Sequence, residues 1–135
     1  MVTELHQLNW LAIVVAALAG YFPGAIWYSP IGFLKPWARE LGVDLNAKPD
    51  GVGLKVAIGL IPALVAAIVF AMIEGPHPSL HHGLVMGAEV AVGFIASSLA
   101  IQYLYERRSL TFWLINSGYH LLQFLLMGIV LALWP

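Results

Sequence analysis

The chain has 135 residues, of which 61% are hydrophobic and only 10% are charged, and its mean hydropathy is +0.86. A soluble domain carries about a quarter charged residues, so this composition is typical of a membrane protein. The net charge of −1 gives no electrostatic basis for binding nucleic acid, and the absence of cysteine excludes disulfides, thiolate metal sites and a cysteine nucleophile. We therefore expect one small domain over residues 1–135, with the lipid bilayer as its first partner.

Four apolar stretches are each long enough for a helix that crosses a bilayer, which needs about 20 residues. We predict spans at about residues 8–28, 54–73, 80–105 and 110–133. Pro23 and Pro62 should bend the first two spans, because a proline inside a helix removes a backbone hydrogen bond. The predicted fold class is therefore all-α, an integral membrane four-helix bundle.

The connection between the first two spans contains a short amphipathic stretch. Residues 32–41 place apolar side chains on one helical face and charged side chains on the others, which is typical of a helix lying in the membrane interface. A polar loop rich in turn-forming residues follows at 43–53. At the start of the chain, residues 1–6 lack the basic region of a cleavable signal peptide, so we expect the first span to be retained.

The basic residues predict the orientation of the protein. All 6 Lys and Arg residues lie in or beside the first and third connections, and they are Lys35, Arg39, Lys48, Lys55, Arg107 and Arg108. Cytoplasmic connections are enriched in Lys and Arg, so these two connections should be inside and both chain termini outside. We therefore expect a multi-pass protein of the cell (inner) membrane.

The last span carries a row of polar side chains. Asn116, His120 and Gln123 are spaced i, i+4 and i+7, so they share one helical face. Polar groups are costly in hydrocarbon, so this face should look toward other helices or toward water. Glu89 is the only carboxyl group deep within a span, and the tight turn at 106–109 should place it within one helical turn of Gln123. We predict that Glu89, Asn116, His120 and Gln123 form one seam that binds a small solute or cation.

Other interpretations of this seam stay open. The same side chains could be structural, forming hydrogen bonds between neighbouring helices without binding anything. His120 could ligate the metal of a haem or chlorin, since imidazole is the usual protein ligand there, although no second mid-span histidine exists. Ser117 and His120 could suggest a hydrolase pair, but no orienting third residue or oxyanion motif accompanies them.

Four of the 5 histidines fall on the side predicted to be outside. His77, His81 and His82, with His6 and Glu74 nearby, supply the imidazole and carboxylate groups that suit Zn²⁺, Ni²⁺ or Cu²⁺. Their spacing matches no known site, and two prolines interrupt the loop. The candidates are therefore a divalent metal site at these three histidines, or polar residues that only cap the third span.

Two pairs of glycines, Gly20/Gly24 and Gly83/Gly87, have the spacing that lets helices approach closely in a membrane. Together they exceed what one tight hairpin needs. We therefore expect a homo-oligomer or a subunit of a larger membrane complex, in which any pathway would lie between protomers.

Several short motifs together resemble a known family. They are Asn9-Trp10-Leu11, Gly24-Ala25-Ile26-Trp27-Tyr28-Ser29-Pro30, Lys35-Pro36-Trp37, Tyr103-Leu104-Tyr105-Glu106 and Ile115-Asn116-Ser117-Gly118-Tyr119-His120. In these motifs the chain resembles the domain of unknown function 1761 family of small prokaryotic membrane proteins. The resemblance implies four membrane helices and brings no activity, so the roles of Glu89 and of the outer histidines are argued from this sequence alone.

The sequence thus leads to three hypotheses for function. The first is a small polytopic membrane protein that binds or passes a small solute or cation through the seam. The second is a non-catalytic accessory or scaffold protein whose seam is structural, and the third is a membrane-embedded enzyme. No catalytic residue is assigned, and no resident cofactor is expected. Water between the helices would favour the first hypothesis, and a dry, fully paired seam would favour the second.

Overall fold

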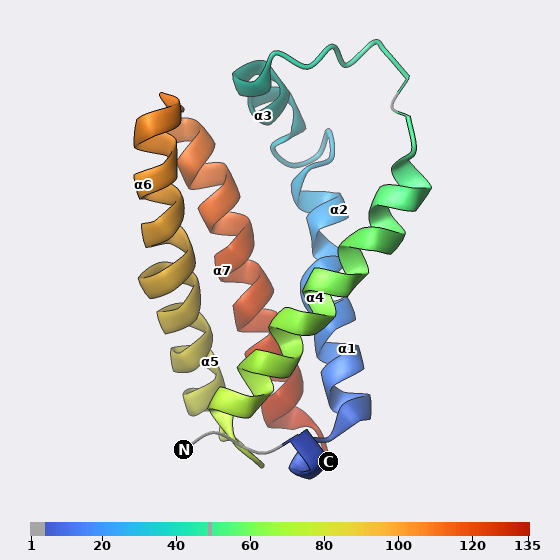
Figure 1. The fold of residues 1–135 in the computed structure, drawn as a ribbon, viewed down its shortest axis with the longest axis vertical. Coiled ribbons are helices and arrows are strands. Elements are labelled where there is room, and N and C mark those ends of the chain that lie inside the picture. The colour runs from blue at the N-terminus through green and yellow to red at the C-terminus, as the bar shows by residue number, and fades with distance from the viewer. Residues whose placement is uncertain (1–4, 49) are drawn as a thin grey trace.

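The computed structural model describes residues 5–48 and 50–135 (Figure 1). Residues 1–4, which belong to the signal-peptide argument, and residue 49 of the predicted polar loop lie outside the described residues. Every regular element of the described part is helical. In chain order the elements are η1 (Leu5–Gln7), α1 (Trp10–Tyr21), α2 (Pro23–Trp27), α3 (Leu34–Leu41), α4 (Val52–Glu74), α5 (Leu80–Ala88), η2 (Glu89–Ala96), α6 (Ser97–Glu106) and α7 (Leu110–Leu133).

Four of these helical stretches are long and apolar enough to cross a membrane, and their bounds are close to those predicted. They are Trp10–Trp27, Val52–Glu74, Leu80–Glu106 and Leu110–Leu133. The first combines α1 with α2, and the third combines α5, η2 and α6. The predicted all-α four-helix fold is therefore confirmed, and α3 is the short helix predicted after the first span. Ala38 on the apolar face of α3 is buried against the bundle.

The first span breaks where its proline lies, and the third span contains a distortion that the sequence did not predict. α1 ends at Tyr21 and α2 begins at Pro23, because proline is well suited to the first turn of a helix. In the third span, η2 is a π-helix, whose wider turns change the direction in which side chains leave the helix. The Ser97 hydroxyl donates to the Val92 carbonyl within this segment at 2.9 Å.

α7 is the central helix of the bundle. In Figure 1 it lies between the α5–α6 helix on one side and α1 on the other, and it packs against both. α4 crosses the bundle obliquely, so its end near α5 lies close to its neighbours while its beginning diverges from them. The buried core consists of Ile13, Ala16, Ala17, Ala67, Phe70, Ala71, Ala91, Phe124 and Met127.

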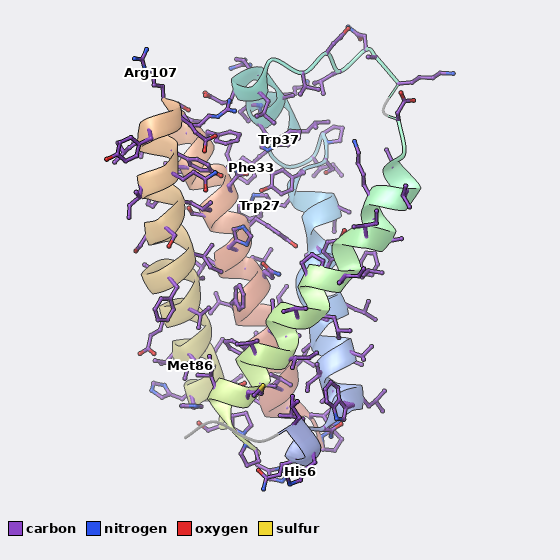
Figure 2. The ribbon with its side chains drawn as sticks, in the orientation of Figure 1. His6, Trp27, Phe33, Trp37, Met86 and Arg107 are labelled. Carbon is purple, nitrogen blue, oxygen red and sulfur yellow. The ribbon has the colours of Figure 1, made fainter. Side chains whose placement is uncertain are left out.

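The two ends of the bundle differ in charge. All the basic residues lie in or beside the connections at one end, here named the basic end, where Figure 2 shows Arg107. The opposite end, here named the terminal end, holds η1, the turn between α4 and α5, and the last residues of the chain; Figure 2 shows His6 there. Gln7 and Pro135 line one cavity, so the two ends of the described chain lie together.

α5 and α7 pack with their backbones in contact. A Cβ atom added at Gly83 would lie 2.6 Å from the Gly128 carbonyl oxygen, and one added at Gly87 would lie 2.6 Å from the Phe124 carbonyl oxygen. In the first span, a Cβ atom added at Gly20 would lie 3.0 Å from a carbonyl oxygen of α7. These glycines therefore make room for a helix of the same chain, so they no longer support the prediction of a homo-oligomer.

Candidate functional site

The polar face of α7 is divided between two environments, and the first is a hydrogen-bond network near the basic end. The Tyr28 hydroxyl donates to Asn116 Oδ1 at 2.7 Å, and Asn116 Nδ2 donates to the Tyr103 hydroxyl at 3.0 Å. These bonds join the end of the first span, α6 and α7. Asn116 is thus bonded on both sides by partners from its own chain, so this part of the predicted seam connects helices.

Aromatic side chains fill the space around this network. The Trp27 indole N–H donates to the Ile115 carbonyl at 2.9 Å, and its ring lies over Gly118, where a Cβ atom would be 2.8 Å from Trp27 Cζ2. The Trp27 and Phe33 ring centroids are 4.8 Å apart, and Figure 2 shows Trp37 beyond them toward the basic end. Motif residues from the first span, α3, α6 and α7, which carried the family resemblance, therefore meet in one place.

Tyr119 compensates for the break in the first span. Its hydroxyl lies 2.9 Å from the Gly20 carbonyl oxygen and 3.0 Å from the Tyr21 carbonyl oxygen, and donates to both. The Ala25 N–H bonds to the Phe22 carbonyl at 2.9 Å, one residue short of the usual α-helical acceptor. A side chain of α7 thus supplies a donor to carbonyls next to the proline break.

One turn further along α7, the polar face meets a groove. The groove lies between α1, α4 and α7, with one residue of η2 at its edge, and has a volume of about 310 Å³. It is lined by Tyr21, Gly59, Pro62, Ala63, Ala66, Ile95, Tyr119, His120, Gln123 and Phe124. The α4 residues in this lining are all small or compact, so α4 passes α7 without filling the space between them.

His120 and Gln123 form a hydrogen-bonded pair in this lining. His120 Nδ1 lies 2.9 Å from Gln123 Oε1. Because an amide oxygen only accepts, Nδ1 donates in this pair, and in the neutral form of the ring Nε2 is then the acceptor. Within the described chain neither side chain makes another hydrogen bond, so the pair offers one acceptor (the imidazole Nε2) and one donor (the Gln123 amide nitrogen).

The structure does not bring Glu89 into the seam, which corrects the prediction. The predicted depth agrees, since Gly87 packs on Phe124, the neighbour of Gln123. The rotation does not agree: Glu89 follows Gly87 by two residues, which is about 200° around the helix, so it points away from α7. Accordingly, Glu89 is exposed on the outer face of the third span and makes no hydrogen bond within the described chain.

The outer histidines are not gathered into a metal site. Within residues 5–48 and 50–135, no three His, Cys, Asp or Glu side chains lie where they could hold a metal ion together. His77 lies in the turn with a left-handed φ of 51°, and His81 and His82 are consecutive on α5, so their side chains diverge. All three are exposed. The geometry therefore gives the predicted divalent metal site no support.

The hydrolase pair is not formed either. The Ser117 hydroxyl is buried and makes no hydrogen bond, whereas His120 is bonded to Gln123. A serine nucleophile needs a base within hydrogen-bond reach, and this arrangement does not provide one. Ligation of a haem or chlorin by His120 stays a prediction that the structure does not test.

Sequence reasoning missed the α4 side of the groove. Gly59, Ala63 and Ala66 are spaced i, i+4 and i+7, so they form a row of small residues on one helical face. That spacing was available in the sequence and marks a small-residue face of the second span, although it does not show whether a neighbouring helix closes over that face. Tyr21 and Tyr119 were also missed, because their approach depends on the break between α1 and α2.

The fold and the groove define a class: an all-α protein with four helices long and apolar enough to cross a membrane, and a groove with polar side chains beside its last helix. Residues 11–132 match the family described as "Protein of unknown function (DUF1761)", and the chain belongs to that family. The match confirms the resemblance found in the sequence motifs. Comparisons with curated proteins and with solved structures gave no match. The family description assigns no activity, so function is argued from the groove.

Proposed function

We propose that this protein binds a compact, largely apolar molecule that carries one hydrogen-bonding group, in the groove between α1, α4 and α7. The observation that supports this most directly is the His120–Gln123 pair, because both residues line the groove and each keeps one side-chain nitrogen without a hydrogen-bond partner in the described chain. A carboxylic acid, a primary amide or an alcohol could bond to both atoms. Small-molecule sites are commonly apolar cavities of about 300 Å³ or more with a few placed polar groups, and this groove fits that description.

Passage of a cation across the membrane has less support than binding. Glu89, the only carboxyl group of the predicted seam, lies on another face of the bundle, and Asn116 is bonded within the chain. The groove itself contains no carboxylate. Without a carboxylate, one imidazole and one amide supply few ligands for a cation, whereas both can form hydrogen bonds to a neutral group.

The proposal is tested with photoreactive alkyl probes in lipid nanodiscs. One alkyl chain ends in a carboxylic acid, an amide or an alcohol, and the control chain ends in a methyl group. We expect at least one polar probe to crosslink to residues lining the groove, with competition by its unlabelled form and loss in His120→Phe. The matched control Glu89→Gln should keep the crosslink, because Glu89 lies on the opposite face. Equal crosslinking by all probes, unchanged in His120→Phe, would contradict the proposal.

The scaffold hypothesis is the second candidate, and the Asn116 network favours it. That network contains only groups of the chain itself, as expected of side chains that hold helices together. A scaffold would show no polar probe held in the groove, so the same experiment separates the two functions.

We further propose that the basic end faces the cytoplasm and that both termini lie outside the inner membrane. The distribution of Lys and Arg supports this orientation, and so does the meeting of the two chain ends at the terminal end. Because the chain has no cysteine, Lys48→Cys and Pro78→Cys can each be probed alone with an impermeant thiol reagent on intact cells. Labelling at position 78 with protection at position 48 is expected, and the reverse would overturn the orientation.

Self-association also stays a proposal, on a different basis from the glycines. Glu89 is exposed at the level of the groove, where a carboxyl group facing lipid is costly, and a second copy of the chain would cover it. Native mass spectrometry from nanodiscs should show an oligomer that Glu89→Leu alters. Monomer alone in both proteins would contradict self-association.

A further inference from the structure

A buried carboxyl group lies at the terminal end, away from the groove. Glu74 is the last residue of α4, and its side chain is only 7% exposed. Neither of its carboxyl oxygens has a hydrogen-bond partner in the described chain. The sequence placed Glu74 beside the outer histidines and did not predict its burial, which is a finding of the structure.

The neighbouring backbone explains how this carboxyl group is accommodated. A Cβ atom added at Gly83 of α5 would lie 3.0 Å from Glu74 Oε1 and 2.6 Å from the Gly128 carbonyl oxygen of α7. One glycine therefore leaves space for both the carboxyl group and the backbone of α7. The following turn reverses sharply through Gly75 and His77, which have positive φ values of 86° and 51° and place the start of α5 beside the end of α4.

The elements around Glu74 supply no counter-charge to this carboxyl group. α7 carries no Asp, Glu, Lys or Arg, and its single histidine is eight residues, or about 12 Å along the helix, from Gly128. Among residues 5–48 and 50–135, the other titratable side chains at this end are histidines: His77 in the turn, His81 and His82 in the first turn of α5, and His6 in η1. All four are exposed, and none of them bonds to the Glu74 carboxyl group.

From this geometry we infer that Glu74 is a proton-binding site, and that its bound proton is required for the end of α4 to pack against α5 and α7. An ionised carboxylate buried without a partner is far more costly than a neutral carboxyl group, so the packed arrangement favours the protonated form. Loss of the proton favours an arrangement in which Glu74 reaches water, and the adjacent turn is exposed and offers that path. This inference does not rest on binding in the groove.

The sign of the pH dependence follows from linkage. Protons stabilise the packed form, so acid keeps the end of α4 packed and alkali releases it. Between the carboxyl pKa of the open form and the higher pKa of the packed form, the ratio of open to packed protein should rise about tenfold for each pH unit, and above the packed-form pKa it should level off. Glu74→Gln and Glu74→Met carry no ionisable group, so both should stay packed at every pH.

The first test measures opening at this junction. Ala71→Cys places a single thiol in a buried position one turn before Glu74, and its rate of labelling is compared with the rate in Ala71→Cys/Glu74→Gln at the same pH. The ratio of the two rates cancels the pH dependence of the thiol itself. We expect a ratio near one in acid that increases in alkali; a ratio that stays constant between about pH 5 and pH 9 would overturn the inference. Glu74→Met replaces Glu74→Gln if the latter does not fold.

The second test observes the proton directly. Infrared difference spectra of the native protein and Glu74→Gln at about pH 6, where an ordinary glutamate is ionised, should show loss of a protonated carboxylic acid band. Glu106→Gln is the matched control, because Glu106 ends α6 in an exposed position 3.9 Å from Arg108, and its replacement should remove a carboxylate band. Loss of a carboxylate band in Glu74→Gln would show that Glu74 is ionised and would refute the inference.

Discussion

The two sides of α7 use small residues to opposite effect. On the side of α5, Gly83 and Gly87 bring two backbones into contact and leave no space. On the side of α4, a row of small residues at Gly59, Ala63 and Ala66 lines a groove of about 310 Å³. Small residues therefore permit a close approach without enforcing one, and the path of the partner helix decides whether the space is closed.

The path of α4 has identifiable causes. Pro62 interrupts its backbone hydrogen bonds near the middle, and the Tyr21 hydroxyl donates to the Val56 carbonyl at 3.1 Å, which links the diverging half of α4 to the end of α1 at one point. Residues 52–58 are exposed, and Figure 1 shows that this part of α4 diverges from the rest of the bundle. α5, by contrast, follows a tight turn and runs alongside α7. We refer below to the α5 side of α7 as the closed side and to the α4 side as the open side.

The largest expected effect is on the closed side. Gly87→Leu should cost at least about 3 kcal/mol of unfolding free energy, because its side chain would meet the backbone of α7 and the two helices would have to separate. The matched control is Gly93→Leu in the same span, where a Cβ atom would meet nothing within 4 Å. Denaturation in one fixed detergent measures both variants. Equal losses would show that the closed side is not specially close-packed.

The next comparison uses two consecutive residues of α4. Ala67 is fully buried in the core, so Ala67→Leu should cost about 2 kcal/mol through overpacking. Ala66 lines the groove, so Ala66→Leu should change stability by less than about 1 kcal/mol while filling the space. The crosslinking experiment with the polar probes should then fail in Ala66→Leu although the protein is folded. A large destabilisation by Ala66→Leu would show that the open side is in fact closed.

The sequence predicts where a residue lies along its helix better than it predicts which way the side chain points around the helix axis. The lengths of the apolar stretches predict the four spans, and the basic connections predict that both termini lie on the same side. The tight turn at 106–109 predicts that Glu89 lies at the level of Gln123. The prediction for Glu89 was wrong in its rotation about the helix axis. The glycines of α5 determine this rotation because they face α7. The sequence suggested instead that they face a second copy of the chain, so it did not predict that Glu89 points away from α7.

The open side could not be predicted for a related reason. A row of small residues has the same spacing whether a neighbour closes over it or not, and the difference lies in the tilt of α4. That tilt depends on Pro62 together with a contact from Tyr21, which is distant in sequence. The burial of Glu74 likewise depends on a glycine in the next helix and on a sharp turn, so local composition alone does not predict it.

A smaller effect is expected where the polar face of α7 is bonded within the chain. Tyr28→Phe should cost about 1–2 kcal/mol, because it leaves the Asn116 oxygen without its donor. Asn116→Leu should cost a similar amount, because it leaves two tyrosine hydroxyls without their partner. The double variant should cost less than the sum of the two, since the unpaired groups are removed together. Strict additivity in thermal denaturation would contradict the network.

The smallest effect on stability, and the most informative one, is expected at His120. The His120–Gln123 hydrogen bond, at 2.9 Å, is about as long as the bonds of Asn116. His120 lines the groove, however, where an incoming polar group or water can replace a lost partner. His120→Leu should therefore change the unfolding free energy by less than about 1 kcal/mol and still abolish crosslinking of the polar probes. Gln123→Leu should do the same, since it removes the other half of the pair. If His120→Leu destabilises as strongly as Asn116→Leu and the probes never bind, the whole polar face of α7 is structural. The scaffold hypothesis would then hold, and the groove would be only the space that an oblique helix leaves beside α7.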